Sequence, residues 1–125
     1  KSSSIVYIIG TTNKVKIEDV INAARYFYNK TGRRVTFEYI LIKDVNASAD
    51  NANELCRLIG NLNCHINLIP VNGTEHIQLY PPEADEVKKF QMILEKHGRT
   101  TTVRKQMGDK IQAACGQLKR RYLKN

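Results

Sequence analysis

Apolar positions recur along this chain at two spacings, one typical of helices and one typical of buried strands. In IEDVINAARYFYNK (17–30) they return every three or four residues, which predicts an amphipathic helix that ends at Gly32. The next stretch, RRVTFEYILI (33–42), is rich in β-branched and aromatic residues and contains neither Gly nor Pro. It therefore predicts a strand that is buried on both faces.

The same alternation of helix and strand continues through the rest of the chain. Helical spacing after Asp50, the expected N-cap, predicts a second helix, and nearly continuous apolar runs predict further strands. The remaining predicted elements are helices over 50–59 and 83–98, strands over 64–71 and 99–105, a candidate strand over 4–9, and a loop or short helix over 109–121.

Strands that alternate with helices of this length predict crossover connections and a mostly parallel sheet. The fold class is therefore α/β, with three to four mostly parallel strands alternating with helices. Such a sheet has too few strands to close a barrel, so it is either a small open sheet or a piece of a larger one. The 125 residues contain no internal repeat or linker, and we expect residues 1–125 to form a single domain or a fragment.

The charge of the chain indicates a class of partner. Twenty Lys and Arg against twelve Asp and Glu give a formal net charge of +8. This balance favours nucleic acid over a membrane, because the chain has no apolar run of transmembrane length and no prominent basic amphipathic helix. A solvated basic surface explains the charge equally well. The first residue is Lys, which favours a processed product or a piece of a longer protein.

The three cysteines predict reduced thiols in the cytoplasm. Their number is odd and no secretory signal precedes them, which is typical of a reducing compartment. Cys56 lies on the apolar stripe of its predicted helix. Cys64 and His65 are neighbours in a predicted strand, so their side chains point to opposite faces and do not meet. We expect both cysteines to be core residues, and their spacing predicts no metal site.

Cys115 is the candidate for chemistry, because its neighbours are small and the surrounding sequence is basic. A positive environment lowers the pKa of a thiol and favours the nucleophilic thiolate. A structural role for a single cysteine is the alternative. Asn72 follows a predicted strand, where it offers a donor and an acceptor to a small polar ligand. An ordinary Asn-Gly turn is the alternative there.

Three motifs make the chain similar to a known family. TGRRVTFEYILIKDVN (31–46), CHINLIPVN (64–72) and TVRKQMGDKIQAACGQL (102–118) resemble the C-terminal part of the RlmN/Cfr-type radical SAM methyltransferases, and the last two favour the RlmN type. The resemblance implies the C-terminal part of a partial (β/α) radical SAM barrel. It also implies methylation of C2 of an adenosine in 23S rRNA and in tRNA. Residues 1–14 match the family poorly.

The resemblance also implies roles for particular residues. The cysteine at the position of Cys115 carries the methyl group, which S-adenosylmethionine supplies, and the asparagine at the position of Asn72 contacts that cofactor. A second S-adenosylmethionine is cleaved at a 4Fe-4S cluster, and the resulting radical activates the methylated cysteine for addition to adenine. The residues expected to meet RNA phosphates are Arg104, Lys105, Arg120 and Arg121.

The chain departs from the family in one decisive respect. Its cysteines at 56, 64 and 115 cannot form the family's CxxxCxxC cluster motif, so the cluster ligands lie outside this chain. We therefore expect the remaining N-terminal part of the enzyme as a partner, and we expect this chain to be inactive by itself. The alternative is a standalone basic RNA-binding module without catalysis. It predicts salt-dependent RNA binding that is lost when Arg104, Arg120 and Arg121 are neutralised.

Overall fold

The computed structural model describes residues 5–9, 14–72 and 79–104, with side chains described from residue 17 onward. Within these residues, helices and strands alternate as the hydrophobic pattern predicts. The elements are β1 (Ile5–Ile9), α1 (Lys14–Thr31), β2 (Val35–Leu41), α2 (Ala49–Ile59), β3 (Cys64–Pro70), α3 (Ala84–Lys96) and β4 (Thr100–Val103).

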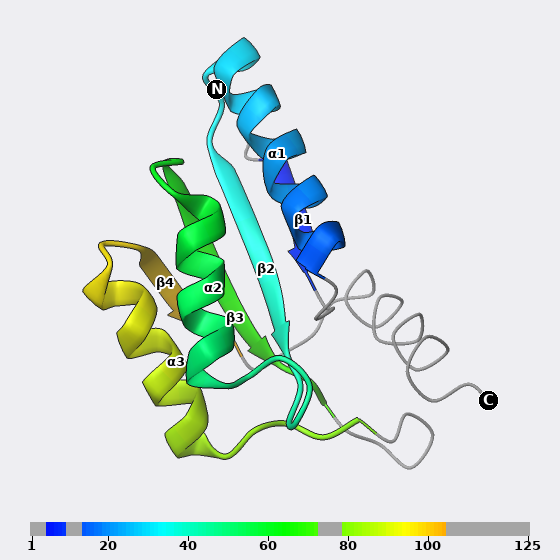
Figure 1. Cartoon of the computed structure of the whole chain (residues 1–125), viewed down its shortest axis with the longest axis vertical. Coiled ribbons are helices and arrows are strands. Elements are labelled where there is room, and N and C mark those ends of the chain that lie inside the picture. The colour runs from blue at the N-terminus through cyan, green and yellow to red at the C-terminus, as the bar shows by residue number, and fades with distance from the viewer. Residues whose placement is uncertain (1–4, 10–13, 73–78, 105–125) are drawn as a thin grey trace, which may run out of the picture.

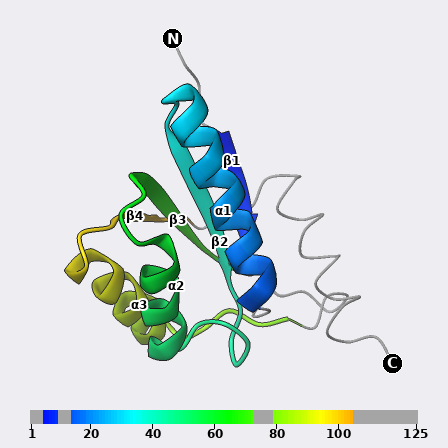
Figure 2. The same ribbon diagram turned by 45° about the horizontal axis from the view of Figure 1, so that its top comes forward.

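The four strands form one sheet in the order β1-β2-β3-β4, and every neighbouring pair is parallel. Each helix connects two neighbouring strands, and all three helices lie over the same face of the sheet (Figure 1). The view in Figure 2 shows the same single helical layer in front of the strands. The predicted parallel α/β sheet is confirmed, and the candidate strand near the N-terminus is part of it.

The core lies between this helical layer and the sheet. Alternate residues of β2 and β3 point toward the helices, and the largest of them, Phe37 and Tyr39, are almost fully buried. The ring of Tyr39 packs against Phe90 of α3, with 5.1 Å between ring centroids. Cys56 and Cys64 also belong to this core, as their sequence positions predict. Burial of apolar surface here fixes the helices on the sheet.

The opposite face of the sheet is polar over much of its area. It presents the alternate residues of the strands, and no helix among the described residues covers it. Near the carboxyl ends of the strands it becomes apolar, where Ile40 and Ile69 are fully buried. Its polar side chains are those of Thr36, Glu38, His65, Asn67, Thr100 and Thr102.

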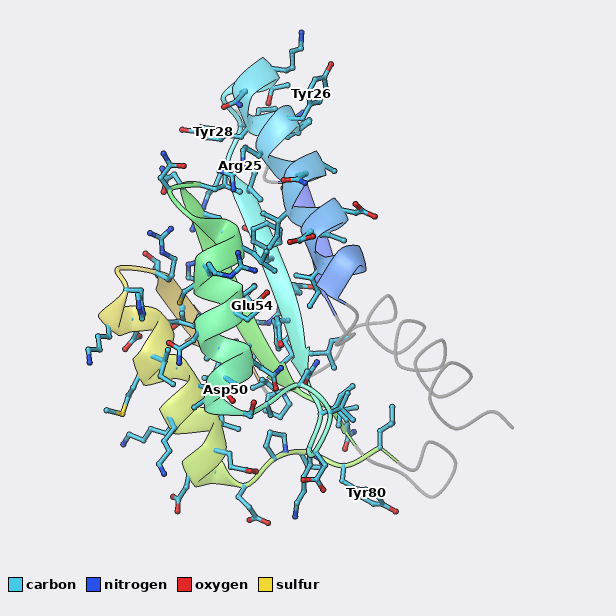
Figure 3. The ribbon with its side chains drawn as sticks, viewed as in Figure 1. Arg25, Tyr26, Tyr28, Asp50, Glu54 and Tyr80 are labelled. Carbon is cyan, nitrogen blue, oxygen red and sulfur yellow. The ribbon has the colours of Figure 1, made fainter. Side chains whose placement is uncertain are left out.

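The start of α2 differs from the prediction. The N-cap is Ser48 and not Asp50: the Ser48 hydroxyl accepts the backbone N–H of Asn51 at 3.1 Å. The Asn51 side chain accepts the backbone N–H of Ser48 at 3.1 Å in return. Asp50 lies in the first turn, where its charge favours the helix dipole (Figure 3). The reciprocal pair of hydrogen bonds decides the boundary, because it satisfies two backbone donors at once.

Candidate functional site

The candidate site lies at the edge where the parallel strands have their carboxyl ends. Hydrogen bonds extend the ladders past the strands, from Val71 N–H to the Leu41 carbonyl at 2.9 Å and from Arg104 N–H to the Leu68 carbonyl at 2.9 Å. The segments that follow β2, β3 and β4 therefore leave the sheet at one edge. These segments belong to the three motifs that carry the family resemblance. Ligands of open parallel sheets gather at such an edge.

The loop after β2 is held by a buried asparagine. Asn46 is fully buried, and its side chain accepts the backbone N–H of Ile42 and donates to the Ile40 carbonyl, both at 2.8 Å. The backbone carbonyl of Asn46 accepts the hydroxyl of Tyr39 at 2.9 Å. Asp44 takes a left-handed conformation within this turn, with φ of 62°. These hydrogen bonds hold the loop against the end of β2. The position of Asn46 in the sequence does not predict this role, because a polar loop residue is ordinarily expected to face solvent.

Asn72 lies at this edge with an exposed side chain, two residues past the end of β3. This position suits the predicted contact with a small polar ligand, which stays a prediction. Cys115, the predicted methyl carrier, lies outside the described residues, as do Lys105, Arg120 and Arg121. Their predicted roles therefore also stay predictions.

Arg104, the fourth predicted RNA contact, has an internal partner. Its guanidinium Nη1 donates to the Glu38 carboxylate at 2.8 Å. The side chain of Glu38 is 13% exposed, whereas that of Arg104 is 44% exposed. The pair joins residues 66 positions apart in the chain. Sequence reasoning missed it because no local spacing connects β2 with β4.

Several other cations of the chain are also engaged within the protein. Arg25 of α1 donates to the carbonyls of Leu58 at 3.2 Å and Ile59 at 3.0 Å, so it caps the end of α2. Figure 3 shows Arg25 reaching from α1 toward that end of α2. Arg57 pairs with Glu54 at 2.6 Å on the surface of α2. Arg99 donates to the Leu62 carbonyl at 3.1 Å. The net charge of +8 therefore overstates the charge that is free to meet a polyanion.

His65 confirms the predicted separation from Cys64. Its Nε2 lies 2.8 Å from the Thr102 hydroxyl on the polar face, whereas Cys64 belongs to the core on the helical side. The Nδ1 atom of His65 is buried and has no hydrogen-bond partner among the described residues. The two residues cannot act as a thiolate–imidazole pair.

The two described cysteines are protonated, structural thiols. Burial raises the pKa of the Cys64 thiol to about 11, and the neighbouring Arg99 and Arg25 only partly offset this effect. Burial likewise raises the pKa of the Cys56 thiol. Iron–sulfur clusters are held by thiolates, which these environments disfavour. Within the described side chains, no group of three His, Cys, Asp or Glu is arranged to hold a metal ion.

We expect iodoacetamide to alkylate Cys64 very slowly in the folded chain at pH 8. With a pKa of about 11, only about one thiol in a thousand is ionised at that pH. Unfolding returns the thiol to an ordinary pKa, so alkylation should accelerate by roughly 100-fold. Peptide mass spectrometry with and without denaturant measures both rates. Equal rates in the two conditions would contradict the burial of this thiol.

The same pKa shift predicts the sign of a pH effect on stability. As the pH rises from the ordinary thiol pKa toward 11, Cys64 ionises in the unfolded chain before it ionises in the folded chain. The unfolded state then binds fewer protons, so the contribution of Cys64 to the free energy of unfolding falls across this window. Below the ordinary thiol pKa the contribution is constant.

None of the helices in the described part of the chain is both long enough and apolar enough to cross a membrane. No family model matches the chain.

Curated relatives match most of the chain. It is 45% identical over 113 residues to the probable dual-specificity RNA methyltransferase RlmN of Clostridium novyi, a match that covers 90% of this chain and 33% of the relative. It is 47% identical over 112 residues to the protein of the same description from Alkaliphilus oremlandii, with 90% and 33% covered. The chain thus spans about one third of the length of these relatives.

Solved structures agree with the sequence matches. A radical SAM methyltransferase from Sphaerobacter thermophilus superposes with a TM-score of 0.68 at 47% identity, over 79% of this chain and 29% of that chain. A domain of pyruvate-formate lyase-activating enzyme from Bacteroides vulgatus superposes with a TM-score of 0.64 at 16% identity, over 81% and 66%, and shows the fold alone. The chain is therefore related to the RlmN-type radical SAM methyltransferases over about one third of their length, and this is the family that its three motifs predict.

Proposed function

We propose that this chain is the C-terminal catalytic portion of a radical SAM enzyme that methylates C2 of adenosine in 23S rRNA and in tRNA. One observation carries the proposal. The three family motifs follow or form three neighbouring parallel strands, so that the segments after them leave the sheet at one edge. This arrangement supports a single site at that edge, to which the loop held by Asn46 and the side chain of Asn72 belong.

Cys115 is the methyl carrier in this proposal. S-adenosylmethionine supplies the methyl group when bound. The Cys115 thiol would first lose its proton to solvent, and the thiolate would then take the methyl group from the sulfonium, which leaves as S-adenosylhomocysteine, so that Cys115 holds the group as a thioether. Asn72 offers an amide donor and a carbonyl acceptor to the cofactor from the end of β3. A reducing cytoplasm suits a carrier that has to stay a free thiol.

The 4Fe-4S cluster does not fit the residues of this chain. Cys56 and Cys64 face the helical core with raised pKa values, and both lie apart from the candidate edge. The cluster ligands therefore belong to the N-terminal part of the longer protein, which completes the barrel. It follows that residues 1–125 are one unit of that enzyme and are inactive alone.

RNA binding by this portion rests on its cationic side chains. Lys105, Arg120 and Arg121 serve phosphate groups in the proposal, a contact that carries no sequence information and weakens with salt. Arg104 belongs to the same predicted set; its guanidinium pairs with Glu38, and its side chain is 44% exposed.

The test uses the longer protein, purified without oxygen from its source cells, beside the isolated chain. We expect the longer protein to contain iron and sulfide and to convert adenosine to 2-methyladenosine in rRNA and tRNA. We expect the isolated chain to transfer no methyl group under the same reducing conditions. Nucleoside mass spectrometry measures the product. Methyl transfer by the isolated chain, or a longer protein without cluster and product, would overturn the proposal.

A further inference from the structure

Tyr80 is an exposed aromatic residue at the candidate edge of the sheet. It is 61% exposed, and Figure 3 shows its side chain pointing away from the sheet and the helices. Its backbone carbonyl accepts the N–H of Lys43 at 2.7 Å, and Lys43 lies two residues past the end of β2. Tyr80 therefore lies at the same edge as the loop held by Asn46 and the side chain of Asn72.

The backbone that carries the Tyr80 ring is held on both sides. Leu79 before it and Pro82 after it are buried. Tyr80 also directly precedes Pro81, and the residue before a proline is restricted to extended conformations. The hydrogen bond from Lys43 fixes the same residue to the end of β2. A side chain on such a segment loses little backbone freedom when a ligand packs against it, so binding there costs little entropy.

Two other large apolar side chains of the described residues are similarly exposed, but their surroundings differ. Tyr26 is 66% exposed and lies in α1 at the opposite end of the molecule (Figure 3). The Lys30 ammonium lies 5.5 Å from the centroid of its ring. Met92 lies in the second half of α3, which runs back toward the amino ends of the strands. Among the described residues, the Tyr80 ring has no aromatic or cation–π partner, so its face is open to a ligand.

We propose that Tyr80 binds an unpaired base of the substrate RNA by stacking its ring on that base. This inference rests on the proposed function. An enzyme that modifies a base within a folded RNA has to take it out of its stack, so the neighbouring base loses a partner that an aromatic ring can replace. Stacking on a ring is possible for every base, because every base has a π-face. It therefore suits an enzyme that accepts two RNAs without requiring one sequence around the target.

The experiment uses the longer protein with its cluster and an RNA hairpin centred on the methylated adenosine, whose position is mapped by nuclease digestion and mass spectrometry. We expect Tyr80→Ala to raise the dissociation constant for this hairpin by roughly 5- to 100-fold, the size of the effect of one base–aromatic stack. Tyr80→Phe keeps the ring and should bind like the wild type. The salt dependence of binding should stay unchanged in both variants, because a phenol releases no counterions from RNA.

A series of hairpins, each with one abasic nucleotide near the target adenosine, identifies the stacked base. In the wild-type protein, loss of that base should weaken binding by a factor similar to that of Tyr80→Ala. In the Tyr80→Ala protein, loss of the same base should weaken binding no further, because the two partners of one contact are not additive. Abasic nucleotides at other positions should have the same effect on both proteins.

Tyr26→Ala is the matched control, because it removes an exposed tyrosine far from the candidate edge. It should leave the dissociation constant unchanged. Thermal unfolding and iron content of the Tyr80 variants should stay near the wild-type values, since the side chain is exposed and the hydrogen bond to Lys43 uses the backbone.

Three outcomes would overturn the inference. The first is an unchanged dissociation constant in Tyr80→Ala, and a lower unfolding temperature beside it would mean that Tyr80 packs against the N-terminal part of the longer protein. The second is an equal loss of binding in Tyr80→Phe, which would assign the effect to the hydroxyl group. The third is additivity at every abasic position. The proposed function is measured separately, by the 2-methyladenosine that the wild-type protein forms: product without stacking overturns this inference alone, and no product overturns both.

Discussion

Replacing Cys115 with alanine in the longer protein is expected to abolish methyl transfer to RNA. Alanine has no sulfur and cannot hold a methyl group between its donor and adenine. Removing a group that forms a covalent intermediate lowers turnover by several orders of magnitude, and we expect a loss of at least roughly 10³-fold. Binding of RNA should stay largely intact, because phosphate contacts carry most of the affinity. Nucleoside mass spectrometry and a filter-binding assay measure the two quantities.

Cys56→Ala provides the matched control for this change. Cys56 lies in the core on the helical side, and burial raises the pKa of its thiol. It therefore has no thiolate to offer near neutral pH. We expect the Cys56 variant to keep its activity with a modest loss of stability. Methyl transfer that survives in Cys115→Ala, or that disappears in Cys56→Ala with the fold intact, would show that the methyl carrier is assigned wrongly.

Replacing Asn46 with alanine is expected to lower the free energy of unfolding by about 2 to 5 kcal/mol. The change leaves the Ile42 N–H and the Ile40 carbonyl without their partners, and Asn46 is fully buried. Each buried polar group left unpaired costs about 1 to 3 kcal/mol. Urea denaturation of the chain, followed by circular dichroism, measures the change.

Two further variants test whether the lost hydrogen bonds cause the loss of stability in Asn46→Ala. Asn53→Ala changes an exposed asparagine on α2, and we expect a difference within about 0.5 kcal/mol. Asn46→Asp keeps the acceptor for Ile42 but loses the donor to Ile40 and introduces a buried carboxylate. Its destabilisation should be larger at neutral pH than at a pH where the carboxyl is protonated. A loss below 1 kcal/mol in Asn46→Ala would contradict the role we assign to this side chain.

The helices and strands followed from the sequence because their physical cause is periodic. The stripe that predicts a helix over 17–30 is the face of α1 that meets the sheet, where Ile17, Ile21 and Ala24 are buried. The apolar run at 33–42 became β2, which alternates between the core and the second face. The start of α2 was misplaced by the choice of Asp50. Both Ser48 and Asp50 are good N-caps, and only the reciprocal bonds with Asn51 decide between them.

Part of the candidate site was likewise predictable from the sequence, and part was not. The family motifs already pointed to Asn72 and Cys115, and strand order accounts for why segments after β2, β3 and β4 leave the sheet at one edge. The separation of Cys64 and His65 was also predictable from the sequence, since successive side chains of a strand point to opposite faces. The sequence did not reveal the pairing of Glu38 with Arg104 or the two side-chain hydrogen bonds of Asn46.

By itself, the sequence determined the class of fold, the order of its elements, the core role of Cys56 and Cys64, and the family resemblance. Each of these features depends either on apolar positions that recur within a few residues or on a contiguous sequence motif. The tertiary structure decided that Arg104 is engaged by Glu38 and that Asn46 holds its loop. These depend on which strands become neighbours and on which polar groups lose contact with water, and both are settled only when the sheet and its helical layer pack together.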